Sequence, residues 1–262
     1  MRPGGRVLTL REPFTDGLYA EAGAMFLWDS CYHLMKYAKL FDLPLNPLQP
    51  SDLTLLFHIR GKRLKVKWGE SVEWPLDLTP EEKELGLFGM RRKYSSLPKD
   101  FGDPTDPNWP PESVRKYDRL TLSEFWRSQG ASPDAVALLA PFFAHGLENG
   151  SALQFLREDA AFLKSSELSP GNQRYVIKGG NDLLPRAFAA KLAEKIYYGA
   201  PVVRIEQDAE KARVVFLQAG AHQVMPADYL ICAIPFSVLK HIEISPPFSL
   251  TKRSAIEQLL YE

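Results

Sequence analysis

The chain has 262 residues, 45% hydrophobic and 24% charged, which is the composition of a globular protein with length for one large or two ordinary domains. Lys plus Arg and Asp plus Glu number 32 each, and this balance argues against a nucleic-acid partner, which would call for a basic excess. The cysteines Cys31 and Cys232 form no disulfide or zinc pattern, so we expect a cytoplasmic setting, and no apolar run is long enough for a membrane segment.

The first quarter of the chain predicts short strands, one helix and a hairpin. Residues 5–10 and 17–20 favour short strands. The spacing of apolar residues predicts a helix over Ser30–Phe41, and three prolines then break the pattern. Alternating residues predict a hairpin between Leu53–Ile59 and Arg63–Trp68.

The middle of the chain predicts an irregular segment followed by helices. Residues 70–118 are rich in proline and charge, and "DFGDPTDPNWPPES" is expected to be irregular. Thr121 with Glu124 three residues later forms a capping-box pattern. Ser132 before Pro133 predicts the start of a second helix, and residues 151–164 favour a third.

The last third returns to alternating strands and helices. Tyr175–Lys178 favours a strand, and a turn at 179–182 leads into a helix with apolar residues at every fourth position. Residues 201–207 and 212–217 predict paired strands. The apolar run "YLICAI" at 229–234 predicts a strand buried on both faces. We therefore expect an α/β fold whose two ends, 1–25 and 175–240, form one domain around an insertion.

Three blocks carry a family resemblance. They are Arg2-x-Gly4-Gly5-Arg6 followed by Glu21-Ala22-Gly23-Ala24-Met25; Gly179-Gly180-x-x-x-Leu184-Pro185 followed by Pro201-Val202-Val203-Arg204-Ile205; and Ala227–Pro235 followed by Pro246-Pro247. In this order and spacing they resemble the flavin-dependent amine oxidase family, which includes monoamine oxidases, polyamine oxidases and L-amino-acid oxidases.

The resemblance implies FAD as cofactor and an interrupted FAD/NAD(P)-binding Rossmann-like domain with an inserted substrate-binding and helical domain. It divides the chain into five expected segments. These are a partial FAD-binding segment (1–25), a substrate-domain segment (26–120), a helical segment (121–174), a second FAD-binding segment (175–240) and the start of a second substrate-domain segment (241–262).

The resemblance also implies the residues that contact the cofactor. Glycines allow the backbone to approach the cofactor, an arginine suits its phosphates, small residues leave room for the flavin ring, and a strand backbone contacts the adenine end. The implied contacts are Gly4, Gly5, Arg6, Gly23, Ala24, Met25, Phe26 and Val202. No catalytic residue is assigned, because the family's lysine is expected beyond Glu262. No metal site is expected, since His145 and Glu148 alone are too few ligands.

The chain departs from the family in two ways that affect function. The Gly-x-Gly-x-x-Gly unit does not occur in it, so it resembles the central part of such an enzyme. Phe26 stands where L-amino-acid oxidases have an arginine that pairs with the substrate carboxylate, and phenylalanine cannot form that pair. An amine is therefore the more plausible substrate. No histidine lies between His145 and His222 to fill the active-site histidine of those oxidases.

The sequence thus predicts an FAD-dependent oxidoreductase that oxidises the C–N bond of a primary or secondary amine to an imine, with hydride transfer to the flavin. One alternative is a truncated, non-catalytic remnant. Another is one half of a split flavoprotein, completed by a chain that carries the missing FAD-binding unit. A third is a relative of the desaturases or protoporphyrinogen oxidases, which share the scaffold.

Overall fold

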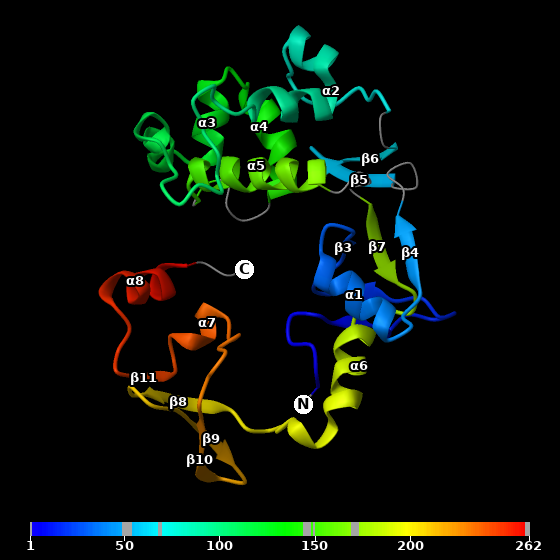
Figure 1. Cartoon of the computed structure of the whole chain (residues 1–262). Coiled ribbons are helices and arrows are strands. Elements are labelled where there is room, and N and C mark those ends of the chain that lie inside the picture. Colours follow the sequence, from blue (N-terminus) through cyan, green and yellow to red (C-terminus); the bar gives the residue numbers. More distant parts are fainter. Residues whose placement is uncertain are drawn as a thin grey trace. The chain divides into compact units, whose positions relative to one another are not determined.

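The chain forms two compact units. The computed structural model describes residues 2–48, 54–67, 70–143, 148, 150–168 and 173–259. The inner unit spans Val7–Leu184, and the outer unit combines Met1–Arg6 with Pro185–Glu262, so the inner unit interrupts the outer one in sequence. Figure 1 shows the elements of both units, and each unit contains helices and strands.

The amino-terminal part of the inner unit is built from short strands. β1 (Thr9–Leu10) pairs antiparallel with β2 (Ala20–Glu21). Both strands are shorter than predicted and begin later. Residues 3–6 form a turn in which Gly4 and Gly5 have φ of 104° and 48°, and Asp16 and Gly17, at φ of 58° and 73°, form another turn ahead of β2. A second sheet has the order β3-β7-β4, and its strands are Leu27–Trp28, Arg174–Ile177 and Leu45–Leu48.

The predicted first helix and hairpin are confirmed. Helix α1 spans Tyr32–Leu40, although Ala38 is the only residue that it buries. The hairpin pairs β5 (Thr54–Ile59) with β6 (Lys62–Lys67), and its turn places Arg60 and Gly61 at φ of 47° and 76°. Leu53 and Trp68, the outer ends of the predicted hairpin, lie outside the described residues.

Helices form the core of the inner unit. They are α2 (Pro80–Tyr94), η2 (Glu112–Arg119), α3 (Leu122–Ser128), α4 (Pro133–Leu139), η3 (Ala140–Phe143) and α5 (Ala152–Leu168). Trp126, Phe125 and Met90 are buried at their centre. The predicted caps are confirmed: Thr121 and Glu124 exchange both capping-box hydrogen bonds, and the Ser132 side chain accepts from the backbone N–H of Ala135.

Helix α2 was not predicted: it lies within residues 70–118, which were noted only for their proline and charge, and ahead of the stretch 100–113 that was predicted to be irregular. The sequence does carry its start signal. Thr79 forms a capping box with Glu82, and Pro80 occupies the first helical position, where its missing N–H costs nothing. Gly86, at φ 62°, kinks the helix in its middle and obscures the apolar period.

The outer unit contains a four-stranded sheet in the order β10-β9-β8-β11. The predicted pair is confirmed as β8 (Val202–Gln207) and β9 (Ala212–Gln218), and β11 (Glu243–Ser245) runs parallel to β8. The edge strand β10 (Ala221–Ala227) was not predicted, and it tolerates Pro226 because it lies at the sheet edge. The helical elements are α6 (Leu183–Leu192), which begins in the inner unit, η4 (Ala193–Lys195), α7 (Phe236–Leu239) and α8 (Leu250–Gln258).

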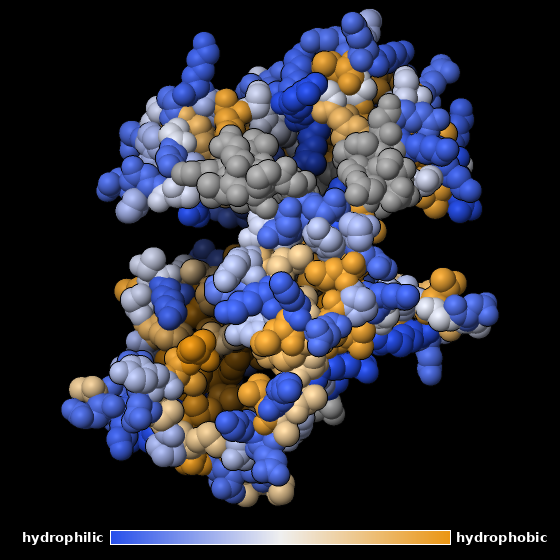
Figure 2. Space-filling model, turned by 45° about the vertical axis from the view of Figure 1, so that its right-hand side comes forward, coloured by the Kyte–Doolittle hydropathy of each residue, from blue (hydrophilic) through white to orange (hydrophobic). Residues whose placement is uncertain are grey.

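The prediction of a buried strand at 229–234 is wrong. These residues form no strand, and Tyr229 and Ile231 are each 93% exposed. A strand buried on both faces needs neighbouring strands to pair with, and among the described residues this segment pairs with none of the strands β10, β9, β8 and β11. Hydrophobic residues, orange in Figure 2, reach the surface of the face that it shows. In the described part of the chain, no helix has the length and hydrophobicity to cross a bilayer.

Candidate functional site

The turn between β7 and α6 requires glycine. Gly179 and Gly180 have φ of 92° and 117°, a region that other residues rarely adopt. A Cβ atom on Gly180 would lie 2.5 Å from Cγ2 of Thr9, which is closer than atoms can approach. Gly180 therefore lets the turn pack directly against β1.

Asn181, the next residue, ties this turn to the segment that follows β2. Its Nδ2 donates to the carbonyl oxygens of Ala24 at 3.0 Å and Met25 at 2.9 Å, and its Oδ1 accepts from the N–H of Ile177 at 2.9 Å. Its own N–H donates to Oε1 of Glu21 at 2.8 Å. Carbonyl oxygens can only accept, so these partners fix the orientation of the amide. Asn181 is 3% exposed, and its side chain holds two consecutive peptide groups in place.

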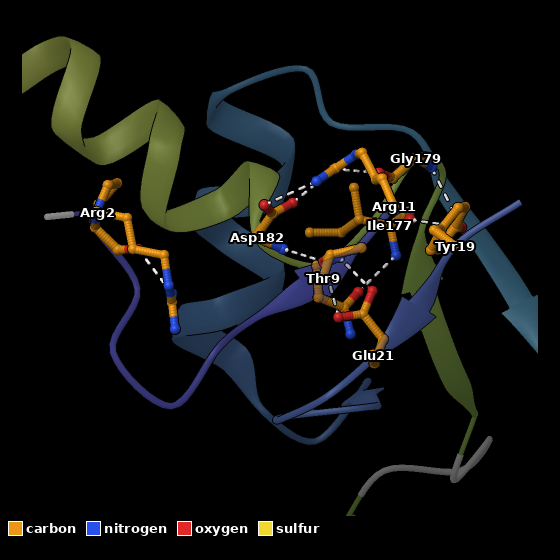
Figure 3. A network of polar contacts seen from close by, with 10 residues as sticks. Arg2, Thr9, Arg11, Tyr19, Glu21, Ile177, Gly179 and Asp182 are labelled. Atoms are coloured by element: carbon orange, nitrogen blue, oxygen red, sulfur yellow. Dashed lines mark hydrogen bonds and ion pairs between the residues drawn. The ribbon is translucent and has the colours of Figure 1, made fainter. Parts of the chain in front are cut away.

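Thr9, Glu21 and Asp182 extend this contact into a network, shown in Figure 3. Thr9 Oγ1 donates to Oε2 of Glu21 at 2.9 Å and accepts from the N–H of Asp182 at 3.1 Å. Arg11 binds Asp182 through both terminal nitrogens, at 3.0 and 2.8 Å, and also donates to the carbonyl of Gly179 at 2.6 Å. The hydrogen bond to Asp182 raises the pKa of Arg11. The two charged side chains differ in exposure: that of Asp182 is 5% exposed and that of Arg11 is 40% exposed.

Tyr19 closes the network at the strand end. Its hydroxyl donates to the carbonyl of Ile177 and accepts from the N–H of Gly179, both at 3.3 Å. We call Thr9, Arg11, Tyr19, Glu21, Asn181 and Asp182 the Asn181 network.

The predicted contacts Gly23, Ala24, Met25 and Phe26 lie in one short segment between β2 and β3. The first three are exposed, Met25 by 50%, and Phe26 is half-buried. The Asn181 network holds this segment from its inner side, so its small side chains stay open on the other. The segment therefore offers a fixed surface to a ligand.

The predicted contacts Gly4, Gly5, Arg6 and Val202 belong to the outer unit. The first three share one turn, in which Arg2 donates to the carbonyl of Gly5 at 2.7 Å. Val202 begins β8, pairs with Phe216 and precedes a bulge in the strand pairing. The structure thus joins 4–6 in one turn and 23–26 in one segment, and the role of all eight residues in binding a cofactor stays a prediction.

These residues fit FAD by their chemistry. Arg6 is an exposed, permanently charged side chain beside a glycine turn, which suits a pyrophosphate. The carbonyl oxygens of Ala24 and Met25 are already bonded to Asn181, so they present little unsatisfied polarity to an aromatic ring.

Most residues of the Asn181 network were not predicted from the sequence. Thr9, Arg11, Tyr19, Asn181 and Asp182 were not among the implied site residues, although Glu21 belongs to the first block. One signal was present: two polar residues directly after Gly-Gly, ahead of an apolar helix. No signal links Arg11 to Asp182, which lies 171 positions away.

The structure gives no support to a metal site among the residues that it describes, where no group of three or more His, Cys, Asp or Glu side chains could hold an ion. Glu148 accepts a hydrogen bond from Ser123 Oγ at 2.9 Å. His145, its candidate partner, lies outside the described ranges.

Comparison with known proteins gives a consistent result. The profile of the family described as flavin containing amine oxidoreductase matches residues 1–262. The L-amino-acid oxidase of Demansia vestigiata is 29% identical over 99% of this chain and 49% of its own length. L-amino-acid oxidase BmooLAAO-I of Bothrops moojeni is 26% identical over 99% of this chain and 51% of its own length.

Solved structures show the fold. Putrescine oxidase bound to putrescine superposes with a TM-score of 0.71 at 18% identity, covering 98% of this chain and 56% of the other. Cyclohexylamine oxidase from Brevibacterium oxydans IH-35A gives a TM-score of 0.69 at 18% identity, covering 97% and 55%. The predicted α/β fold class is thus confirmed. The chain spans about half the length of the relatives that it matches.

Proposed function

Because this chain belongs to the flavin-containing amine oxidoreductase family, we propose that it carries the flavin-facing segment of an oxidase that converts the C–N bond of a small primary or secondary amine to an imine. The observation that carries the proposal is the exposed segment Gly23–Met25, which buried Asn181 fixes through two backbone carbonyls. A preorganised surface of this kind lowers the cost of ordering a bound cofactor.

The proposed cofactor is FAD, which would supply the hydride acceptor. Gly4, Gly5 and Arg6 would bind its pyrophosphate, and the β8 backbone at Val202 its adenine end. The segment Gly23–Phe26 would lie against the flavin ring and exclude water from that side. The five segments expected from the sequence, with boundaries at 25, 120, 174 and 240, remain part of the proposal.

The substrate class is also a proposal. The relatives named above are L-amino-acid oxidases, and the solved structures are oxidases of putrescine and of cyclohexylamine. In this chain Phe26 stands at the position where L-amino-acid oxidases have an arginine that binds the substrate carboxylate. We therefore expect the substrate to be an amine rather than an amino acid.

A reducing, cytoplasmic setting is also part of the proposal. It is supported by Cys31 and Cys232, which are both free thiols.

One observation favours the alternative of a split or completed flavoprotein. Tyr229 and Ile231 expose an apolar run of the kind that a neighbouring strand would normally cover. This supports an oxidase that is completed by further polypeptide carrying a Gly-x-Gly-x-x-Gly unit. The two proposals share the same flavin-facing segment and differ in whether this chain binds FAD alone.

A visible spectrum of the purified protein tests the function. Bound flavin gives absorption bands at about 375 and 450 nm. Asn181→Ala leaves two carbonyls and one N–H without their partner, so we expect FAD affinity to fall about 10- to 30-fold. Asn46→Ala, at an exposed position of β4, is the matched control and should bind FAD like the unmodified chain.

Circular dichroism must show that the Asn181→Ala variant is folded before its affinity is interpreted. Full retention of FAD by that folded variant would refute the role of the segment. A protein that stays colourless with added FAD would refute binding by this chain alone. Yellow colour that appears only on co-purification with a second polypeptide would support the completed flavoprotein.

A further inference from the structure

The hairpin of β5 and β6 carries a row of cations on its outer face. Along β6, Arg63, Lys65 and Lys67 are exposed, and the residues between them, Leu64 and Val66, pack toward the helical core. Because side chains on one face of a strand are two residues apart, these cations follow one another at about 7 Å. We call the three residues the β6 cations.

Nothing acidic balances the β6 cations within the hairpin. Their partners across the two strands are Thr54, Leu56 and His58. Among the described residues, no carboxylate forms an ion pair with the side chain of a β6 cation. The whole chain has 32 basic and 32 acidic residues, so the row is a local excess of positive charge and not a general one. It therefore attracts an anionic partner to this face.

The β6 cations also direct their backbone groups away from β5. The turn at Arg60-Gly61 has two residues with positive φ, so Ile59 and Lys62 form the first hydrogen-bonded pair, and the β6 cations belong to the pairs that alternate with it. Lys67 shows this outward direction. Its N–H donates to Oε2 of Glu70 at 3.0 Å, and its carbonyl accepts from the N–H of Glu70 at 3.1 Å.

The outer edge of β6 is open at the other two cations. In the described part of the chain, β6 pairs with β5 alone, and no backbone hydrogen bond of Arg63 or Lys65 reaches beyond the hairpin. Such an edge is a template for a further strand. Glu70 indicates the chemistry that suits it, because a carboxylate already accepts from the edge N–H of Lys67.

We propose that β6 docks an extended acidic segment of a partner protein, which adds to the open edge as an antiparallel strand with Asp or Glu at alternate positions. An acidic residue opposite Arg63 or Lys65 exchanges both backbone hydrogen bonds with it and places its carboxylate beside the cation. In this mode the backbone bonds supply affinity and the alternate side chains supply selectivity. The inference goes beyond the proposed oxidase function and needs no bound flavin.

The hairpin is held in place for this role, and its outer face suits other polyanions less well. Phe57 and Val66 are buried in the helical core and fix the inner face. Membrane-surface segments combine cations with several large apolar side chains, and the outer face of the hairpin offers Leu56 alone. Single-stranded nucleic acid stacks its bases on aromatic rings, and this face carries no Phe, Tyr or Trp.

Fluorescence anisotropy with a labelled peptide of about eight residues, in which Glu alternates with Thr, measures the docking. The unmodified chain should bind this peptide. A version that is N-methylated at each Glu keeps the charge but loses the backbone donors, so it should bind at least about tenfold more weakly.

Charge reversal tests the selectivity. Arg63→Glu combined with Lys65→Glu should weaken binding of the Glu peptide at least about tenfold, and this variant should instead bind a peptide in which Lys replaces Glu. Arg92→Glu combined with Lys99→Glu is the matched control, because it makes the same change in charge at exposed positions elsewhere in the inner unit. The control should bind the Glu peptide like the unmodified chain.

Circular dichroism establishes that both double variants are folded, and the comparison of the two Glu peptides on the unmodified chain needs no variant. Equal binding of the N-methylated peptide, or equal losses in the two double variants, would show attraction by net charge alone and overturn the inference. Absence of peptide binding would also overturn it, and would leave the cations the role of keeping an open edge soluble. Binding of phosphatidylserine vesicles or duplex DNA in place of the peptide would assign the surface to that polyanion and overturn the inference as well.

Discussion

A few buried polar residues set the local structure of the inner unit. Asn181 and Asp182 are both under 5% exposed, and their backbone N–H groups donate to Glu21 of β2 and to Thr9 of β1, respectively. Glu82 is fully buried among α2 and α4, where it accepts hydrogen bonds from Thr79, Tyr94 and Ser132. Such groups are costly to bury unless every partner is present, so single substitutions should have large and distinguishable effects.

Gly180→Ala should destabilise the inner unit more than Gly17→Ala. Both substitutions force alanine into positive φ, at 117° and 73°, with a cost of about 1–2 kcal/mol each. At Gly180 the new Cβ also meets Thr9 at 2.5 Å, and displacing that side chain adds about 1–3 kcal/mol. At Gly17 nothing lies within 4 Å. Urea unfolding measures both values, and equal losses would contradict the close packing of the turn on β1.

Glu82 should make the stability of the inner unit depend on pH. Burial opposes its ionisation, but the hydrogen bonds from Ser132, Thr79 and Tyr94 outweigh burial and lower its pKa. A lowered pKa in the folded state stabilises the protein above the pKa of the unfolded chain, about 4.3, and this contribution is lost as the pH falls through the folded value. Thermal unfolding between about pH 6 and pH 2 should therefore show a steeper loss for the unmodified protein than for Glu82→Gln.

The control for this experiment is Glu112→Gln, whose side chain is 89% exposed and which should keep the pH dependence of the unmodified protein. Parallel curves for Glu82→Gln and the unmodified protein would show that Glu82 does not contribute to the pH dependence of stability.

The hydrogen bond between Tyr94 and Glu82 also affects stability at alkaline pH, because burial and this bond raise the pKa of Tyr94 to about 12. That stabilisation is complete below about pH 10 and is lost as the pH rises toward 12.

At the scale of elements, a pattern in the sequence forms its structure when its partners are local. The capping boxes at Thr79 and Thr121 connect residues three positions apart, and both helices begin where those patterns place them. The segment 229–234 shows the opposite case. Its composition suits a buried strand, but in the described structure it pairs with no strand, and Tyr229 and Ile231 are exposed.

Ile231→Lys should improve solubility at little cost to folding. Its side chain is 93% exposed, so the change in unfolding free energy should stay within about 0.5 kcal/mol, while binding of a hydrophobic dye and aggregation decrease. Val215→Lys is the contrasting variant, because Val215 is 4% exposed in β9 and a charge there should unfold the outer unit. If Ile231→Lys destabilises the chain as much as Val215→Lys, the run is buried after all.

At the scale of the whole chain, the sequence order differs from the structural units. The outer unit joins the first six residues to the last third of the chain, and the predicted cofactor contacts fall in both units. Residues 4–6 and Val202 lie in one unit, and residues 23–26 in the other. The predicted contacts are therefore divided between two units that are separate in the structure and interleaved in the sequence.

The sequence by itself determined the class of the protein and its local elements. Three ordered blocks indicated the flavin amine oxidase family by resemblance, and that resemblance implied the interrupted α/β fold. The helix caps at Thr121 and Ser132 and the hairpin turn at Arg60 were predictable because their contacts join residues a few positions apart in the chain. Helix α2 was predictable in principle from Thr79, but Gly86 and the surrounding prolines masked its period.

Tertiary structure alone decided the rest. Arg11 meets Asp182 across 171 positions, Asn181 reaches Met25 across 156, and Arg174 stacks on Phe26 from another strand. No periodicity encodes such contacts, since each depends on how β1, β2, β3 and β7 are brought together. The exposure of Ile231 likewise depends on which strands occupy the edges of a sheet. Residue type states what a side chain can bind, and only the packing of distant segments decides what lies within its reach.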